Sequence, residues 1–328
     1  MIQKSRNFTL LVIVIANLLL FALFFINAYA DEPKQVFGRE QIRENIYDSV
    51  ILSDKEFLVI GDRGKIFRSV DGGKSWRAIS SGTAQALFSV SFPDAKNGWI
   101  SGKSGLILHT TDGGITWYKQ ESGVKKNLLS ISFADAIHGC AVGDWGNVII
   151  TKDGGTTWQD ASLKDDVVLY GVCFADSQHG WIIGEFGRIF STVDGGKTWR
   201  LVPSPMEEEH SLFCLTINGE SLYAAGIEGV ILYSDNRGKS WQGAKNESKS
   251  AIYGIKVQGL TGWAVGDVGT ILHTKDGGKS WKSVDVPEDF KLFWFCTVSL
   301  TKNNPERPSG FCAGAHGLFL NIDQGKIR

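Results

Sequence analysis

The chain has 328 residues, of which 43% are apolar and 21% charged, a composition that is typical of a folded globular protein and excludes a disordered chain or a coiled coil. Lysine and arginine number 34 against 35 aspartates and glutamates, so the formal net charge is −1. The chain therefore lacks the positive field that holds a phosphate backbone, and we expect no nucleic acid partner.

The first thirty residues have the pattern of an export signal. Lys4 and Arg6 precede an uncharged stretch, residues 7–30, which ends in the small-residue sequence Ala28-Tyr29-Ala30 before the acidic residue that follows. The apolar stretch is longer than in most cleaved signals, so residues 1–30 are a signal peptide or an uncleaved N-terminal membrane anchor. In both cases the basic residues stay in the cytoplasm and the rest of the chain is exported, to the periplasmic or lumenal side of the membrane.

An eight-residue box recurs along the rest of the chain. Its tryptophans are separated by 41, 41, 41, 42 and 40 residues. The copies are SVDGGKSW (69–76), TTDGGITW (110–117), TKDGGTTW (151–158), TVDGGKTW (192–199), SDNRGKSW (234–241), TKDGGKSW (274–281) and a degenerate seventh, NIDQGKIR (321–328). A second motif, Gly-x-x-Gly, also occurs seven times, from residues 61–64 to residues 314–317. Both motifs count seven units.

Each unit contains four short β-rich runs bounded by turn residues, as in residues 86–118. That is the pattern of one propeller blade, so we predict an all-β fold, a seven-bladed β-propeller over residues 47–328. The seventh unit shows three such runs before the chain stops. We therefore predict that the N-terminal segment, residues 31–46, supplies a closing strand through residues 33–45.

The chemistry of the box predicts a self-contained turn. Its Ser or Thr and its Asp can hydrogen-bond to backbone groups of the same turn, while the paired glycines permit positive φ. The tryptophan then places a large apolar surface between sheets. In the fifth copy asparagine, which makes similar turns, replaces the aspartate. We assign a structural role to Asp71, Trp76, Asp112, Trp117, Asp153, Trp158, Asp194, Trp199, Asn236, Trp241, Asp276 and Trp281.

These boxes, S/T-x-D-G-G-x-S/T-W, resemble the Asp-box or BNR repeat. The wider pattern, clear at residues 92–99 and 174–181, resembles the photosystem II stability/assembly factor family of propellers, over residues of about 47–323. The resemblance implies an exported, non-enzymatic protein that docks to a membrane protein complex or its subunits during assembly, whether a photosystem or a transporter-like assembly. We expect a monomer without a cofactor.

Sialidases share the Asp-box, so the alternative is a carbohydrate-binding or sialidase-like, glycoside-cleaving propeller. The Arg-Ile-Pro segment that sialidases usually carry is absent. Asp62, Asp144, Glu185 and Asp267 could supply the two carboxylates of a glycosidase, but their periodic placement favours a solvated rim. We therefore expect no enzymatic activity and no catalytic residues.

The remaining metal and thiol candidates carry weak patterns. Five widely spaced cysteines form no C-x-x-C pair, so zinc is not indicated, although Cys296 and Cys312 could bridge neighbouring strands. His138 and His179 occupy equivalent positions behind an aspartate, but no third ligand matches them, so we expect polar turn residues and no metal site. One position of the inner strands carries small residues that suit a narrow channel: Ser89, Ser130, Gly171, Cys214 and Gly254, with Trp294 in blade seven.

The Gly-x-x-Gly turns mark the predicted partner-binding rim. The turn between the second and third strands of a blade shares a face with the blade-to-blade connections, opposite the boxes. Blades three to six each offer an apolar residue there, and exposed aromatic side chains beside acidic groups are typical of interface hot spots. The alternative is that each tip packs on its neighbour's loop. We predict partner binding by Arg63, Trp145, Glu185, Phe186, Ile227 and Val268.

Overall fold

The computed structural model describes residues 42–206, 210–302, 304, 306, 308–323, 326 and 327. The predicted signal peptide or anchor over residues 1–30, its cleavage near residues 28–31 and the N-terminal segment up to residue 41 lie outside the described residues. Within the described ranges, no helix has the length and apolar character needed to cross a bilayer.

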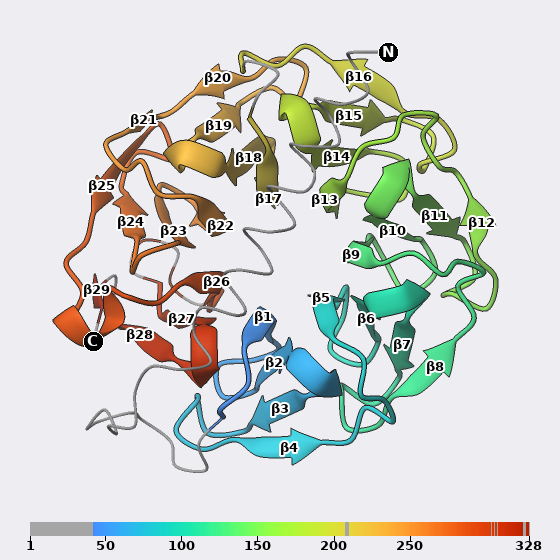
Figure 1. Ribbon diagram of the computed structural model, residues 1–328, viewed down its shortest axis with the longest axis horizontal. Helices are drawn as coiled ribbons and strands as arrows, with labels where there is room; N and C mark the ends of the chain where they lie inside the picture. The colour runs from blue at the N-terminus through green and yellow to red at the C-terminus, as the bar shows by residue number, and fades with distance from the viewer. Residues whose placement is uncertain are drawn as a thin grey trace, which may run out of the picture. The chain divides into compact units, whose positions relative to one another are not determined.

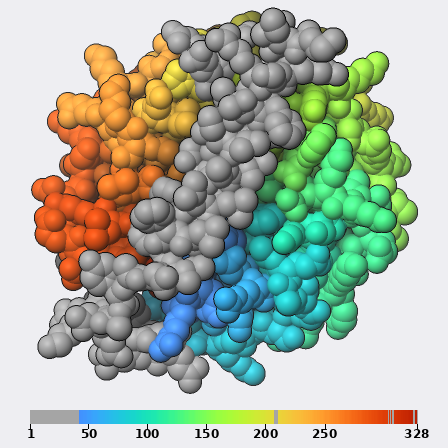
Figure 2. All heavy atoms as spheres, viewed as in Figure 1, coloured from blue at the N-terminus to red at the C-terminus, as the bar shows by residue number. Residues whose placement is uncertain are grey.

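Seven β-sheets follow one another around a central axis, which confirms the seven-bladed β-propeller (Figure 1). Figure 2 shows the colours of successive blades following one another around one face. The innermost strand of each blade comes first in the chain, and the next three lie progressively further out.

The strands divide among the blades as follows. Blade one contains β1 (Ile46–Ile51), β2 (Phe57–Gly61), β3 (Ile66–Ser69) and β4 (Arg77–Ile79); blade two β5 (Leu87–Ser91), β6 (Gly98–Gly102), β7 (Ile107–Thr110) and β8 (Tyr118–Gln120); blade three β9 (Leu128–Phe133), β10 (Gly139–Gly143), β11 (Val148–Thr151) and β12 (Gln159–Asp160); blade four β13 (Leu169–Phe174), β14 (Gly180–Gly184), β15 (Ile189–Thr192) and β16 (Arg200–Val202). Blade five contains β17 (Leu212–Asn218), β18 (Ser221–Gly226), β19 (Ile231–Ser234) and β20 (Gln242–Gly243); blade six β22 (Ile252–Gln258), β23 (Thr261–Gly266), β24 (Ile271–Thr274) and β25 (Ser280–Ser283), with β21 (Lys245–Asn246) beside β25; blade seven β26 (Phe295–Leu300), β27 (Gly310–Gly314), β28 (Phe319–Asp323) and β29 (Lys326–Ile327).

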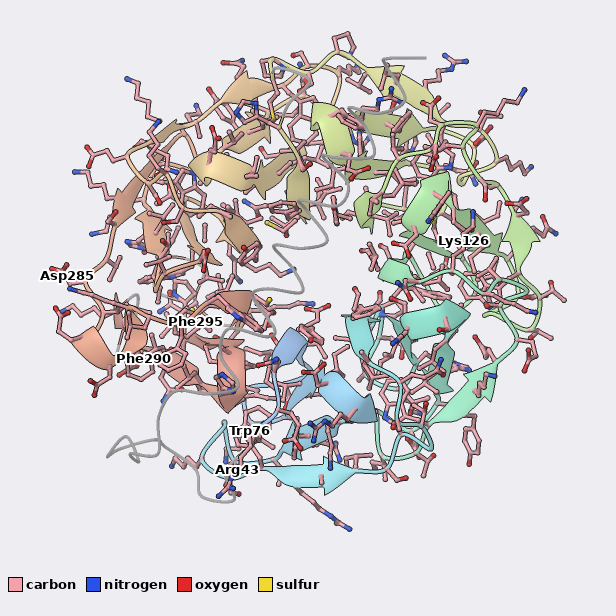
Figure 3. The ribbon with its side chains drawn as sticks, in the orientation of Figure 1. Arg43, Trp76, Lys126, Asp285, Phe290 and Phe295 are labelled. Atoms are coloured by element: carbon pink, nitrogen blue, oxygen red, sulfur yellow. The ribbon has the colours of Figure 1, made fainter. Side chains whose placement is uncertain are left out.

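Single 3-10 turns complete the described elements. Six of them follow the second strand of a blade: η1 (Asp62–Gly64), η2 (Lys103–Gly105), η3 (Asp144–Gly146), η4 (Glu185–Gly187), η5 (Ile227–Gly229) and η7 (Ala315–Gly317). The other, η6 (Glu288–Phe290), precedes β26, where Phe290 stacks on Phe295 at a centroid distance of 6.4 Å (Figure 3).

The hydrophobic core is divided into layers between adjacent blades. The second strands β2, β6, β10 and β14 are buried at every position, because a neighbouring blade covers each face of their sheet. Between blades one and two, Leu58 and Ile60 pack with Leu87 and Ile100. Burial of this kind stabilises the ring at roughly 25 cal/mol per Å² of apolar surface.

Blade seven contains its own outer strand, so the expectation that it has only three strands is wrong. Asp323 pairs with Lys326, and β29 thereby returns antiparallel to β28 even though the seventh box is degenerate. Residues 42–45 form no strand, and the rest of the predicted closing segment lies outside the described residues.

The first and last blades join through side chains. Ile42 and Ile46 pack in one cluster with Phe311, and the hydroxyl oxygen of Ser49 lies 2.8 Å from that of Thr297. These contacts close the ring without an exchanged strand among the described residues.

The inner strands are linked by polar side chains that reach from one blade to the next. The backbone N–H of Val90 donates to Asp48 Oδ2 over 2.9 Å, and that of Val172 donates to Ser130 Oγ over 3.2 Å. These bonds satisfy strand edges that would otherwise be open. In blade seven the equivalent position belongs to Thr297, which lies opposite Ala313 as Ser89 lies opposite Ser101 in blade two. The assignment of Trp294 to this position is wrong, because Trp294 precedes the inner strand, which begins at Phe295.

The five cysteines are free thiols. Cys312 lies opposite Val298 in the β26–β27 pair, so the Cys296–Cys312 bridge considered above is not formed. Burial raises the pKa of Cys173 to about 11 and that of Cys214 to about 12. Both thiols are therefore protonated at neutral pH and are poor nucleophiles.

Candidate functional site

The Gly-x-x-Gly turns of the seven blades lie at one end of the ring, where the 3-10 turns face the viewer in Figure 1. In blade three a Cβ on Gly143 would lie 1.8 Å from the carbonyl oxygen of Asn127. The φ of Gly146 is +66°, which favours glycine. The two glycines therefore allow the turn to lie against the blade-to-blade connection, and they fix where the two residues between them point.

The second residue between the glycines forms the tip of each turn, and in every blade it is left-handed. The tips and their φ values are Arg63 (54°), Ser104 (56°), Trp145 (64°), Phe186 (60°), Glu228 (55°), Val268 (50°) and His316 (52°). This region is unfavourable for bulky and β-branched residues. Since the same turn accepts seven residue types, the turn itself does not require an aromatic side chain.

Apolar side chains in these turns are exposed in blades three to six. Trp145 and Val268 are each 59% exposed, Phe186 is 47% exposed and Ile227 is 37% exposed. The alternative that tips pack on a neighbouring loop applies to Trp145 in part, because Lys126 Nζ, labelled in Figure 3, lies 5.4 Å from its ring centroid.

The two charged residues of the predicted rim differ in setting. Arg63 is exposed, whereas Glu185 is partly buried and its Oε2 accepts a 2.8 Å hydrogen bond from the backbone N–H of Val168. The rim therefore presents apolar tips with carboxylates set behind them.

Six aromatic residues at the start of the inner strands form a second feature of this end, named here the axial cluster: Tyr47, Phe88, Tyr170, Phe213, Tyr253 and Trp294. Tyr47 lies 6.0 Å from Phe88 and 6.4 Å from Trp294 between ring centroids. Phe213 lies 5.2 Å from Tyr170 and 5.7 Å from Tyr253. All six are partly exposed.

Sequence reasoning missed the axial cluster, although its signal is periodic. Tyr47, Phe88, Tyr170, Phe213 and Tyr253 each follow a fully buried aliphatic residue at the start of an inner strand. In a regular strand the aromatic side chain would lie on the opposite face of the sheet from the aliphatic side chain before it. The register shift at this point leaves the aromatic residue unpaired and keeps it at the rim.

Carboxylates accompany the aromatic rings. The hydroxyl of Tyr47 donates to Asp62 Oδ1 over 2.7 Å. Burial raises the pKa of Asp144, Asp267 and Glu185 above their usual ranges. An incoming cation would favour the charged form of these groups, so the combined surface is suited to an apolar segment that carries lysine or arginine.

The histidine positions are turn residues in the structure. The backbone N–H of His138 donates to Asp135 Oδ1 over 2.8 Å, and His138 Nδ1 lies 2.9 Å from Asp135 Oδ2. His179 and Asp176 repeat this arrangement. Among the described residues no group of three or more His, Cys, Asp or Glu side chains could hold a metal ion.

The boxes lie at the other end of the third strand of each blade. Asp71 accepts hydrogen bonds from the hydroxyls of Ser69 and Ser75, at 2.8 and 2.6 Å, and from the backbone N–H of Ser75 at 2.9 Å. In the fifth box Asn236 takes the aspartate position, and its amide nitrogen donates to Ser240. The carboxylate or amide at this position is thus hydrogen-bonded within the box itself, as expected for a structural turn.

Acid should destabilise the protein through these boxes. The hydroxyl and then the backbone N–H of Ser75 lower the pKa of Asp71 to about 2, from an ordinary value of 3.8. A carboxylate with a depressed pKa stabilises the folded state above its unfolded pKa, and this stabilisation is lost as the pH falls towards 2.

The Asp71→Asn variant, which copies the natural fifth box, should therefore fold. Its unfolding free energy should fall less steeply between about pH 4 and pH 2, because its unfolding takes up fewer protons, by up to one. Denaturant titrations at several pH values measure the slope. An unchanged slope would show that Asp71 has an ordinary pKa.

The arrangement of the sheets, with the turns at one end and the boxes at the other, defines the class of this protein. It is a seven-bladed β-propeller whose described rim carries exposed apolar side chains beside carboxylates. The chain belongs to the family described as Photosynthesis system II assembly factor YCF48, whose model matches residues 38–125 and 159–250.

Solved structures share the fold. YCF48 bound to D1 peptide is 20% identical, with a TM-score of 0.68, over 91% of this chain and 99% of that chain. YCF48 from Cyanidioschyzon merolae is 17% identical, with a TM-score of 0.66, over 87% and 99%. The GH74 xyloglucanase from Xanthomonas campestris is 10% identical, with a TM-score of 0.71, over 87% of this chain and 53% of that one. No curated protein sequence matches the chain.

Proposed function

We propose that this protein is a non-enzymatic docking factor that binds an exposed segment of a membrane protein complex, or of one of its subunits, during assembly. The family to which the chain belongs supports an assembly role. A structurally similar member has been solved with a bound peptide. The binding surface that we propose consists of the rim tips Arg63, Trp145, Phe186 and Val268, with Ile227 and Glu185 beside them.

One observation carries this assignment. Trp145, Phe186 and Val268 combine a left-handed backbone with large exposed apolar side chains. A left-handed conformation costs a non-glycine residue roughly 1–2 kcal/mol. A side chain that stays exposed buries too little apolar surface on folding to offset this cost. Such residues contribute more to binding than to the stability of the free protein.

The chemistry of the rim specifies the partner segment. Apolar tips supply desolvated anchors, as in interface hot spots. The carboxylates of Asp144 and Glu185, whose pKa values burial raises, favour a positively charged neighbour. We therefore propose a partner segment with an aromatic or aliphatic side chain next to lysine or arginine, bound by the protein as a monomer.

The proposed location is the exported side of the membrane. Lys4 and Arg6 before the uncharged residues 7–30 support it, since basic residues flanking an apolar segment are retained in the cytoplasm. Protease protection in cells of the native host tests this: the propeller should be degraded by an external protease only after the outer compartment is opened.

Removing two apolar tips should weaken partner capture. Trp145→Ser combined with Phe186→Ser should leave the melting temperature nearly unchanged and weaken capture of the membrane complex by at least about 2 kcal/mol, which is the hot-spot scale. Affinity capture from solubilised host membranes, quantified by mass spectrometry at several bait concentrations, measures the loss.

The matched control is Val193→Ser with Leu201→Ser, which removes two side chains of blade four that are 63% and 62% exposed but lie outside the rim. Capture equal to wild type by the rim variant, with folding intact, would contradict the assignment. The control should retain full capture.

A second candidate is carbohydrate binding or glycoside cleavage. The aromatic axial cluster and the two carboxylates Glu185 and Asp144, which interact electrostatically, favour it, because glycosidases use a pair of carboxyl groups. An oligosaccharide panel separates the two functions: turnover that is lost in Glu185→Gln would establish the enzyme, whereas the docking factor binds none of the panel.

A further inference from the structure

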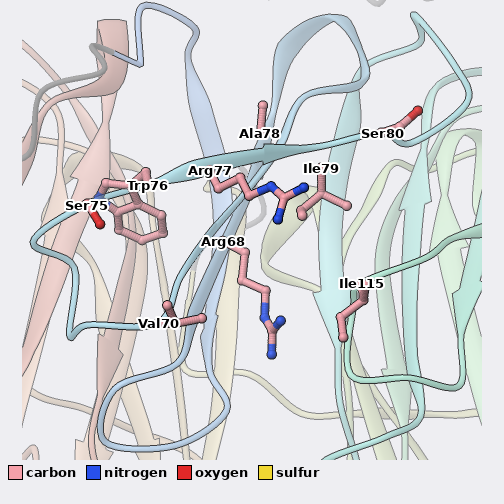
Figure 4. Close-up of a pocket in the computed structure, with 9 residues that line it drawn as sticks. All are labelled: Arg68, Val70, Ser75, Trp76, Arg77, Ala78, Ile79, Ser80 and Ile115. Carbon is pink, nitrogen blue, oxygen red and sulfur yellow. The ribbon is translucent and has the colours of Figure 1, made fainter.

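A pocket of about 430 Å³ lies along the outer strand of blade one, at the box end of β3 and away from the rim (Figure 4). Val70, Ile79 and Ile115 supply apolar walls, and Arg68 and Arg77 extend their guanidinium groups into it. The volume is in the range of small ligand sites. No acidic residue lines it.

The two arginines have only one acidic partner among the described residues. Arg68 and Arg77 lie directly opposite each other in the β3–β4 register, where like charges are unfavourable. Glu56 Oε2 lies 3.2 Å from Arg68 Nη2, and no ion pair of Arg77 occurs within the described part of the chain. The buried Nε of Arg68 has no hydrogen-bond acceptor among the described residues. The pocket therefore has one excess positive charge and an unsatisfied donor.

Other blades lack this pair at the equivalent positions. The equivalent cross-strand pairs are His109–Tyr118, Ile150–Gln159, Ser191–Arg200, Tyr233–Gln242 and His273–Lys282. Burial lowers the pKa of His273, so blade six has one cation there. The arginine pair is thus a property of blade one and not a requirement of the repeat.

Blade six shows how an outer edge of this propeller takes an additional strand. β21 runs parallel to β25, with Lys245 opposite Ser280 and Asn246 opposite Trp281. The backbone N–H of Lys245 donates to the carbonyl oxygen of Lys279 over 2.9 Å.

The equivalent residues in blade one are Ser75 and Trp76, which line the pocket, preceded by Lys74. β4 is the last strand of its sheet, and no strand of the described residues covers its outer edge. Within the described residues, blade one thus has an outer edge like that of blade six, without the additional strand and with two arginines beside it.

We propose that this pocket binds an extended acidic peptide segment of a partner protein. The peptide adds as a strand to the outer edge of blade one and runs parallel to residues 74–76. A partner carboxylate pairs with Arg77 and Arg68, since arginine binds carboxylates through several N–H groups. An aliphatic side chain of the partner peptide, next to that carboxylate, packs on Val70 and Ile115. The peptide backbone forms hydrogen bonds with the backbone of residues 74–76. This site goes beyond the proposed function and does not depend on the rim.

A blocked, fluorescein-labelled peptide of eight alternating valine and glutamate residues tests the proposal with the full-length chain. Fluorescence anisotropy should show saturable binding below about 1 mM, and the valine–glutamine peptide should bind at least tenfold more weakly. Arg77→Gln, at an exposed side chain, should raise the Kd at least tenfold. Ile115→Asp should do the same, because it places a carboxylate in the pocket.

Arg200→Gln is the matched control, because Arg200 has the same place in blade four but lies opposite Ser191. Its Kd should stay within about twofold of wild type, as should that of the double rim variant. Equal binding of both peptides, an unchanged Kd in Arg77→Gln, or no binding by the full-length chain overturns the proposal.

Discussion

Replacing Trp281 by alanine is expected to lower the free energy of unfolding by about 3–5 kcal/mol. Its side chain is 2% exposed, and its indole N–H donates to the carbonyl oxygen of Gly278 over 2.9 Å. Removal of the ring leaves a cavity in the cluster that Trp281 shares with Tyr223 and Ile252, and leaves that carbonyl without this donor. Equilibrium denaturation in urea measures the loss.

Trp158 provides the comparison for this variant. It is half-buried, and its indole nitrogen has no hydrogen-bond partner among the described residues. Trp158→Ala should therefore cost less than Trp281→Ala, although both tryptophans end the same motif. A Trp281→Ala protein that unfolds at the wild-type urea concentration would show that the box tryptophan is not a core residue.

Replacing Gly143 by alanine should cost about 3 kcal/mol, because overpacking against backbone cannot be relieved by a side-chain movement. A Cβ at this position would lie 1.8 Å from the carbonyl oxygen of Asn127 and 3.1 Å from the Cα of Leu128. The φ of Gly143 is −174°, an extended value that any residue adopts. The penalty therefore comes from the close approach alone.

Gly243→Ala is the matched control, because nothing lies within 4 Å of a Cβ built there. It should change the unfolding free energy by less than about 0.5 kcal/mol. Calorimetric melting of the two variants compares them directly. If Gly143→Ala melts as wild type does, the turn can move away from the blade-to-blade connection, and the tips are not rigidly placed.

The sequence predicted the number of blades because each blade repeats its own local signals. The box begins at the end of the third strand, as at Ser69, and ends immediately before the fourth, as at Trp76. The Gly-x-x-Gly turn follows every second strand. Such features depend on residues that are close together in the sequence, so they can be recognised from one sequence alone.

Features that depend on which strands pair, and in which register, were not predictable in the same way. The outer strand of blade seven forms from Lys326 and Ile327, although its box lacks the tryptophan. The register shift before Thr297 decides which residues approach the axis. The pairing of Arg68 with Arg77 becomes visible only when the strand register is known.

Contact between the rim and a membrane protein complex is the central claim, and site-specific photo-crosslinking in the native host tests it most directly. A photo-reactive amino acid replaces either Trp145, at the rim, or Leu201, on the outer strand of blade four; both side chains are exposed, at 59% and 62%. We predict an adduct with a subunit of a membrane protein complex from position 145 and none from position 201. Adducts from position 201 alone, or equal adducts from both positions, would contradict the account.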